Sequence, residues 1–139
     1  MLTKQWETDS LAVFQQQDLT KNAVAAAETA LGLLTATARL NGESKEQPIE
    51  VHIGISSGAT LVGSTQFHGR RGTRWVFSAS GQQVNVAARL AGIAQSGQIL
   101  VSSATKDRLL GQYFIESFGT QKLKNITEEI EAFQLVRRV

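Results

Sequence analysis

The stretch "SASGQQVNVAARL", residues 78–90, decides the fold and points to a site. A turn of small residues ends at Gly81, and the residues after it predict a helix over about 82–94. In that helix Asn85 and Arg89 are four positions apart, so their side chains share one face. A guanidinium is costly to bury without a partner. This face is therefore either solvated or a place where Arg89 meets an anion.

Two features of the stretch favour the anion. The guanidinium of Arg89 is planar, permanently charged and able to bind a phosphate through two hydrogen bonds. The small residues before the helix let a ligand approach the backbone closely. The pattern alone leaves the other alternative open, in which Asn85 and Arg89 are ordinary solvated side chains.

Upstream, "IEVHIGISSG" (49–58) predicts a strand with one buried face. The segment "ATLVGST" (59–65) is expected to return beside it as a hairpin, with the turn near Ser57 and Gly58. The apolar residues that share the buried face are Ile49, Val51, Ile53 and Ile55.

Glycines recur through this region, at Gly54, Gly58 and Gly63. A glycine inside a strand often marks a close backbone approach or a bulge, and the alternative is plain hairpin geometry. The patterns GxxxxGK[ST] and GxGxxG are absent, so these glycines do not form a P-loop or a dinucleotide-binding turn.

The remaining elements follow from periodicity and turn residues. A long amphipathic helix is predicted over 21–40, after a short apolar run at 10–14 that is typical of a strand end. The order of elements predicts an α+β fold, with helices packed on a mainly antiparallel sheet. No linker divides the chain, so residues 1–139 are expected to form a single domain. The other predicted segments are turns or loops at 15–22, 41–48 and 66–72, strands at 73–79, 96–103, 113–123 and 129–136, and a helix at 104–111.

Composition excludes several classes of function. The chain has no cysteine, which excludes disulfides, thiolate catalysis and cysteine-based zinc sites. A formal net charge of +2 is too small to indicate a nucleic-acid partner. His52 and His68 lack metal-ligand spacing, and no stretch is long and apolar enough for a membrane span. The first residues also lack the apolar run of a secretory signal, so a cytoplasmic location is expected.

Taken together, three segments resemble the class III nucleotidyl cyclases, the adenylate and guanylate cyclase catalytic domain. They are "VHIGISSGATLVGS" (51–64), "WVFSASGQQVNVAARLAGIAQSGQILVSSAT" (75–105) and "LKNITEEIEAFQLV" (123–136). The resemblance implies a ferredoxin-like α+β fold. It also implies attack of the 3′-oxygen of a purine nucleoside triphosphate on its α-phosphorus, which yields a 3′,5′-cyclic nucleotide and pyrophosphate.

The resemblance assigns roles to five residues. Asn85 matches the asparagine that orients the ribose, and Arg89 matches the arginine that stabilises charge on the α-phosphate. Ser78 stands at the purine-reading position, where a hydroxyl resembles the variant linked with ATP more than with GTP. Lys4 matches the purine-reading lysine, and Lys124 matches a lysine that meets the terminal phosphates.

The chain departs from the family pattern at the residues that bind the metal ions. The family holds two Mg²⁺ or Mn²⁺ ions on two aspartates. One aspartate belongs to a first strand that would precede Met1, so the expected fold lacks the family's first strand and helix. The ungapped alignment places Thr8 on the other aspartate, and Asp9 one residue late. In a strand, one residue of shift turns a side chain to the opposite face, unless a bulge intervenes.

No metal site is therefore expected in this chain itself. Class III sites lie at a dimer interface, and this sequence resembles the half that supplies Asn85 and Arg89 rather than the metal carboxylates. The expected assembly is a homodimer or a cyclase-domain heterodimer, with the metal held by a partner or by an upstream part of a longer protein. The alternative is a catalytically inactive module for nucleotide binding or dimerisation in signalling.

Overall fold

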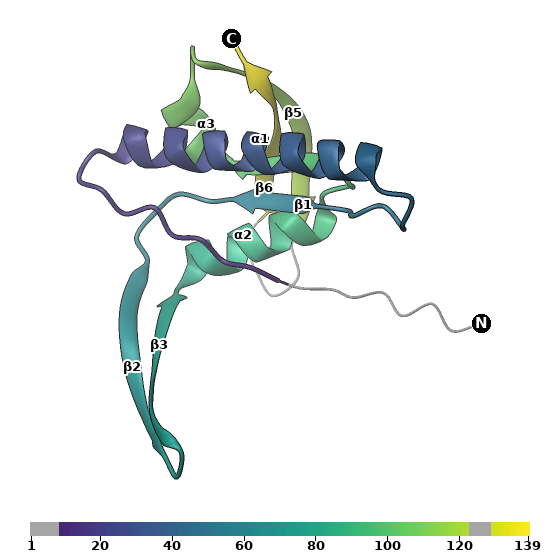
Figure 1. The fold of residues 1–139 in the computed structure, drawn as a ribbon. Coiled ribbons are helices and arrows are strands. Elements are labelled where there is room, and N and C mark those ends of the chain that lie inside the picture. The colour runs from purple at the N-terminus through teal and green to yellow at the C-terminus, as the bar shows by residue number, and fades with distance from the viewer. Residues whose placement is uncertain (1–8, 123–128) are drawn as a thin grey trace.

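A computed structural model describes residues 9–122 and 129–139, with backbone alone at 65, 76 and 77. Its helices and strands alternate along the chain in an α+β order, as predicted (Figure 1). The elements in chain order are α1 (Leu19–Glu43), β1 (His52–Ile55), β2 (Leu61–Gly69), β3 (Gly72–Ser80), α2 (Gln82–Ile93), β4 (Gln98–Ser102), α3 (Ser103–Leu109), β5 (Tyr113–Lys122) and β6 (Glu129–Arg138).

Within residues 9–122 and 129–139, four strands form the main sheet, in the order β1-β4-β6-β5. β1 pairs with β4 in parallel, while β4 with β6 and β5 with β6 are antiparallel pairs. This confirms a mainly antiparallel sheet. Among the described strands, β2 and β3 pair with each other alone, and this β2–β3 hairpin (residues 61–80) projects away from the body (Figure 1).

The main sheet lies between two helical layers. On β4, Ile99 and Val101 join the cluster that contains the buried face of α1, whereas Leu100 joins the cluster of α2. In Figure 1, β1 accordingly lies between α1 and α2. A strand covered on both faces needs a continuous apolar run, and "QILVS" at 98–102 supplies one.

The predicted hairpin between β1 and the segment 59–65 is wrong. The neighbour of β1 is β4, which pairs Gly54 with Leu100. The reason lies in composition, because β2 reads "LVGSTQFHG" and could not fill a position between two helical layers. β2 instead runs on to Gly69, through most of the loop predicted at 66–72.

Two boundaries before β1 also differ from the predictions. Residues 10–14 form no strand, because no described strand lies beside them to complete a ladder. α1 starts within the predicted turn, where the side chain of Asp18 accepts hydrogen bonds from the backbone N–H groups of Thr20 and Lys21. It continues through Asn41, whose side-chain amide bonds the backbone oxygen and nitrogen of Ile49 at 2.9 and 2.8 Å.

A polar cluster ties α1 to the far strands of the sheet. The hydroxyl of Tyr113, at the start of β5, donates a hydrogen bond to the carboxylate of Glu28. The guanidinium of Arg138, on β6, lies 3.1 Å from the same carboxylate. Burial, followed by the bond to Glu28, raises the pKa of Tyr113 from 10.0 to about 12.

Tyr113→Phe is expected to remove a pH-dependent part of the stability at alkaline pH. The folded pKa lies above the unfolded one, so the contribution of Tyr113 is fully present below pH 10.0 and is lost as pH rises through about 12. Urea unfolding between these pH values checks this. The parent protein should lose more stability over the interval than the Phe variant, and equal losses in the two proteins would contradict the assignment.

Candidate functional site

The helix α2 presents Asn85 and Arg89 away from the sheet. Val86 and Leu90 of the same helix are buried against the sheet. Asn85 is exposed and Arg89 is half-buried on the other side of the helix. The placement follows from the helical period, because residues four apart lie one above the other. The spacing in the sequence therefore predicted correctly that the two side chains share a face.

β3 passes into α2 through a single residue, Gly81. Its φ of 127° lies in the region that favours glycine, so the chain can turn sharply there from strand to helix. Ser78 lies three residues before this turn, exposed on β3 and paired with Gly63 of β2. The structure thus places Ser78 at the root of the hairpin, just ahead of the helix that carries Asn85 and Arg89.

The middle of α2 is pressed against β1 at Gly54. A Cβ atom added there would lie 2.1 Å from the carbonyl oxygen of Ala87 and 2.5 Å from the backbone nitrogen of Ala91. The predicted close backbone approach is confirmed at this glycine. At Gly63, by contrast, an added Cβ would meet nothing within 4 Å among the described atoms, so that glycine belongs to plain hairpin geometry.

Side chains hold both ends of α2 as well. The hydroxyl of Ser56 donates to the side-chain oxygen of Gln83 at 2.5 Å, next to Gly58. At the other end, Nδ1 of His52 lies 2.6 Å from the carbonyl oxygen of Ala94. These contacts were not predicted from the sequence, although Ser56 and Gly58 stand in the small-residue run that ends the strand. Anchors at both ends and in the middle fix the position of α2.

Asn85 and Arg89 are available to a ligand. Within residues 9–122 and 129–139, no hydrogen bond or salt bridge joins either side chain to another group. A permanent carboxylate partner for Arg89 would have argued against a phosphate site, and the described part of the chain provides none. The other two predicted site residues, Lys4 and Lys124, lie outside the described residues.

The binding of a metal ion would require carboxylates, and the positions that bear on this are Thr8 and Asp9. Among the described residues, no group of three or more His, Cys, Asp or Glu is placed to hold a metal ion. Asp9 is exposed in an irregular segment, and Thr8 lies outside the described part. The side chains seen here therefore do not fit a site for two divalent cations.

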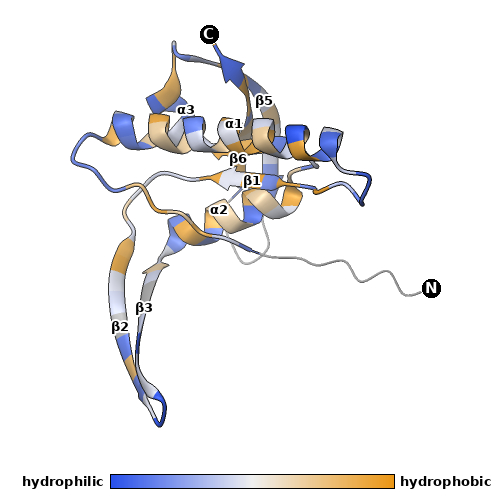
Figure 2. Ribbon diagram, viewed as in Figure 1, coloured by the Kyte–Doolittle hydropathy of each residue, from blue (hydrophilic) through white to orange (hydrophobic). Residues whose placement is uncertain are grey.

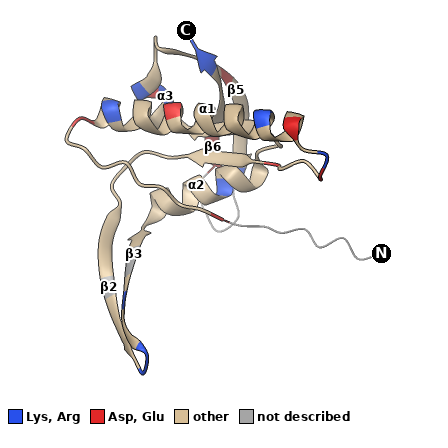
Figure 3. Cartoon of the chain, in the orientation of Figure 1, with Lys and Arg blue, Asp and Glu red and all other residues tan. Residues whose placement is uncertain are grey.

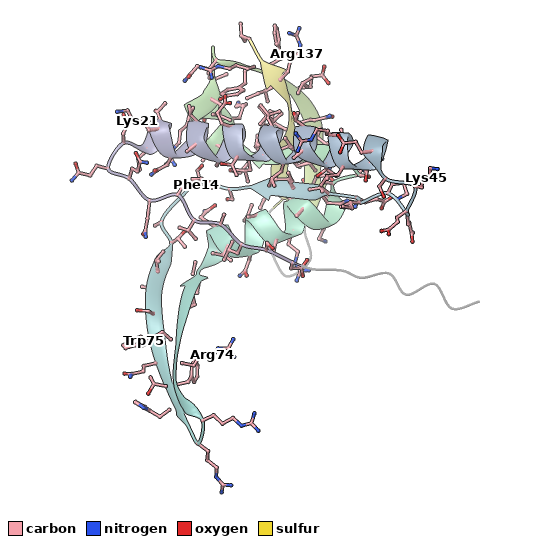
Figure 4. The ribbon with its side chains drawn as sticks, in the orientation of Figure 1. Phe14, Lys21, Lys45, Arg74, Trp75 and Arg137 are labelled. Atoms are coloured by element: carbon pink, nitrogen blue, oxygen red, sulfur yellow. The ribbon has the colours of Figure 1, made fainter. Side chains whose placement is uncertain are left out.

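The β2–β3 hairpin carries a basic tip. Arg70, Arg71 and Arg74 are exposed there, and residues 61–80 contain no Asp or Glu. Figure 3 shows this end of the hairpin in blue without red. Figure 4 shows Arg74 and Trp75 leaving the hairpin on different sides, as consecutive strand residues do. Trp75 is 65% exposed.

The family model described as the adenylate and guanylate cyclase catalytic domain matches residues 9–137. No curated protein sequence matches the chain significantly. None of the helices in the described residues combines the length and apolarity that crossing a bilayer requires.

Solved structures match with the same architecture. The adenylyl cyclase CyaB from P. aeruginosa matches with a TM-score of 0.73 and 24% identity, over 86% of this chain and 61% of that chain. An adenylate/guanylate cyclase/hydrolase from Silicibacter pomeroyi gives 0.62 and 29%, over 82% and 62%. The guanylate cyclase domain of RhGC from Catenaria anguillulae, in complex with GTP, gives 0.67 and 21%, over 85% and 61%. The chain spans about three-fifths of the length of these relatives.

Proposed function

Because the chain belongs to the family of adenylate and guanylate cyclase catalytic domains, we propose that it binds a purine nucleoside triphosphate at α2 and helps to form a 3′,5′-cyclic nucleotide and pyrophosphate in cytoplasmic signalling. The observation that carries this proposal is the pairing of Asn85 and Arg89 on one accessible face of α2. They follow directly on the Gly81 turn and on Ser78.

In the proposed reaction the 3′-oxygen attacks the α-phosphorus. The bond from that phosphorus to the bridging oxygen breaks, pyrophosphate leaves and the 3′-hydroxyl proton is released. Arg89 binds the α-phosphate oxygens, where negative charge increases in the transition state. Asn85 hydrogen-bonds the ribose and aligns the 3′-oxygen.

The base is proposed to meet Ser78, with Lys4 as a second contact, while Lys124 meets the terminal phosphates. The resemblance of Ser78 to the family's hydroxyl variant, which is linked with ATP, supports ATP as the preferred substrate. The hydroxyl itself can both donate and accept a hydrogen bond, so it does not separate adenine from guanine alone. A site on one subunit surface also needs a second subunit to enclose the nucleotide. The proposed assembly is therefore a dimer of cyclase domains.

The carboxylates for Mg²⁺ or Mn²⁺ are proposed to come from a complementary cyclase domain or from a longer parent chain. The described residues do not fit a two-metal site, so this chain by itself is expected to be almost inactive. The same observation supports a second candidate function, a module that binds nucleotide or dimerises without turnover.

A complementation assay separates the two candidates. The chain would be mixed with a cyclase domain that retains its metal carboxylates but has its own asparagine and arginine replaced by alanine. We expect cyclic nucleotide and pyrophosphate only in the mixture with Mg²⁺ or Mn²⁺, and more product from ATP than from GTP. Nucleotide binding without product, with several such partners, would favour the inactive module.

A further inference from the structure

The outer side of α1 carries few charges, since Glu28 is the only charged residue of this helix between Lys21 and Arg39. Its buried side consists of Ala23, Ala27 and Ala30. The central part of the opposite side carries small or apolar residues, with Lys21 near one end of the helix and Glu43 at the other. Figure 2 shows hydrophobic colour along much of α1. A surface helix normally turns charged residues to solvent, so this face is typical of a helix covered by a partner. We define the α1 face as Ala25, Thr29, Gly32, Leu33, Ala36 and Leu40.

The apolar side chains of this face are far from buried. Leu33 is 50% exposed and Leu40 is 48% exposed, one heptad further along the helix. Residues seven apart lie almost in line on a helix. The two leucines therefore form the edge of a contact strip along α1, a helix about 37 Å long at 1.5 Å per residue.

Gly32 lies at the middle of the α1 face. Glycine inside a helix is destabilising relative to alanine, and among the described atoms nothing lies within 4 Å of a Cβ added at Gly32. No contact within the described chain therefore explains a glycine there. A glycine at the centre of an exposed face does allow the backbone of a second helix to approach closely.

The charges of α1 indicate which helix fits. Lys21, Glu28, Arg39 and Glu43 alternate in sign along it (Figure 3). Lys21 and Glu43 are equally far from Gly32, so in an antiparallel pair centred on Gly32 each lies opposite the other. Glu28 takes no part in this pairing, because its carboxylate already binds Tyr113 and Arg138 of its own chain. A parallel pair would instead place like charges together.

We propose that the α1 face packs antiparallel against the α1 face of a second copy of this chain, with the two-fold axis at Gly32. Such a contact is self-complementary and closes as a dimer. It lies on the opposite side of the sheet from Asn85 and Arg89. The proposal is therefore independent of the cyclase function, and the contact leaves the α2 face open for a different subunit.

A charge-swap series tests the contact by sedimentation equilibrium, without nucleotide. Lys21→Glu replaces two attractive pairs of the dimer by repulsive ones, and we expect the dissociation constant to rise about tenfold. Adding Glu43→Lys to the same chain restores opposite charges, so the double variant should return close to the parent value. A monomer at every concentration, or a double variant that associates no better than Lys21→Glu, would overturn the proposal.

Cross-linking tests the axis and the direction. The chain has no cysteine, so single cysteines can be introduced cleanly. In the antiparallel pair only residue 32 faces itself, so Gly32→Cys should form a disulfide dimer under mild oxidation, whereas Ala25→Cys should not. Cross-linking of both variants would indicate a parallel pair, and cross-linking of neither would place any self-association on another surface, such as the β2–β3 hairpin. Circular dichroism confirms that each variant is folded.

Discussion

Arg89→Ala is expected to lower the rate of cyclic nucleotide formation in the complemented assembly by at least about a hundredfold. Removing one preorganised donor to a developing oxyanion typically costs about 10²–10³ in kcat, and Arg89 is the cation that α2 presents on its accessible face. Arg89→Lys should restore only part of the rate, because lysine keeps the charge but loses the planar, bidentate fork. Initial rates of pyrophosphate release give kcat and KM separately.

The effect of Arg89 is expected mainly in kcat, because charge on the α-phosphate increases in the transition state. Arg108→Ala is the matched control, since Arg108 is also a half-buried arginine on a helix but lies outside the proposed site. A normal rate in Arg89→Ala, or an equal loss in Arg108→Ala, would remove Arg89 from the chemistry.

Gly54→Ala is expected to destabilise the fold by at least about 3 kcal/mol, at the upper end of overpacking costs. The added methyl would lie 2.1 Å from the carbonyl oxygen of Ala87 and 2.5 Å from the nitrogen of Ala91. Both are backbone atoms of α2, so no side chain can rotate to relieve the clash. Against a typical total of about 5–15 kcal/mol, such a loss is large. Urea unfolding followed by circular dichroism measures it.

Gly92→Ala provides the control for this change. Gly92 lies in α2 itself, and nothing described lies within 4 Å of its added Cβ. Alanine there should leave stability unchanged or raise it by up to about 1 kcal/mol, through helix propensity. If Gly54→Ala were as stable as Gly92→Ala, α2 would not be seated on β1 as described.

Local sequence patterns predicted where helices and strands form better than they predicted which strands pair with each other. The α1 and α2 helices and the β3 strand follow from local patterns, which depend on residues close in sequence. The neighbour of β1 was predicted wrongly, because a parallel pair joins strands that are distant in the chain. The strand predicted at 10–14 failed for a related reason, since no described strand lies beside it.

In the candidate site, too, features within one helix could be predicted from the sequence, whereas contacts between distant segments could not. The common face of Asn85 and Arg89 could be predicted from spacing alone, because both stand on one helix. The bond from Ser56 to Gln83 joins residues 27 positions apart, and only the packing of α2 on β1 brings them together. Gly54 was a sequence signal for close approach, but its partners Ala87 and Ala91 depend on that same packing.

The β2–β3 hairpin has a consequence for how this architecture can vary during evolution. In the part of the chain that the structure describes, its strands pair with each other alone, from Leu61 with Ser80 to Gly69 with Gly72. Residues could be inserted or deleted near its tip, in matched numbers on the two strands, without shifting the register of β1 against β4. Lengthening a surface excursion of this kind costs little entropy. The length of the hairpin can therefore differ between relatives while the β1–β4 pair on which α2 packs stays the same.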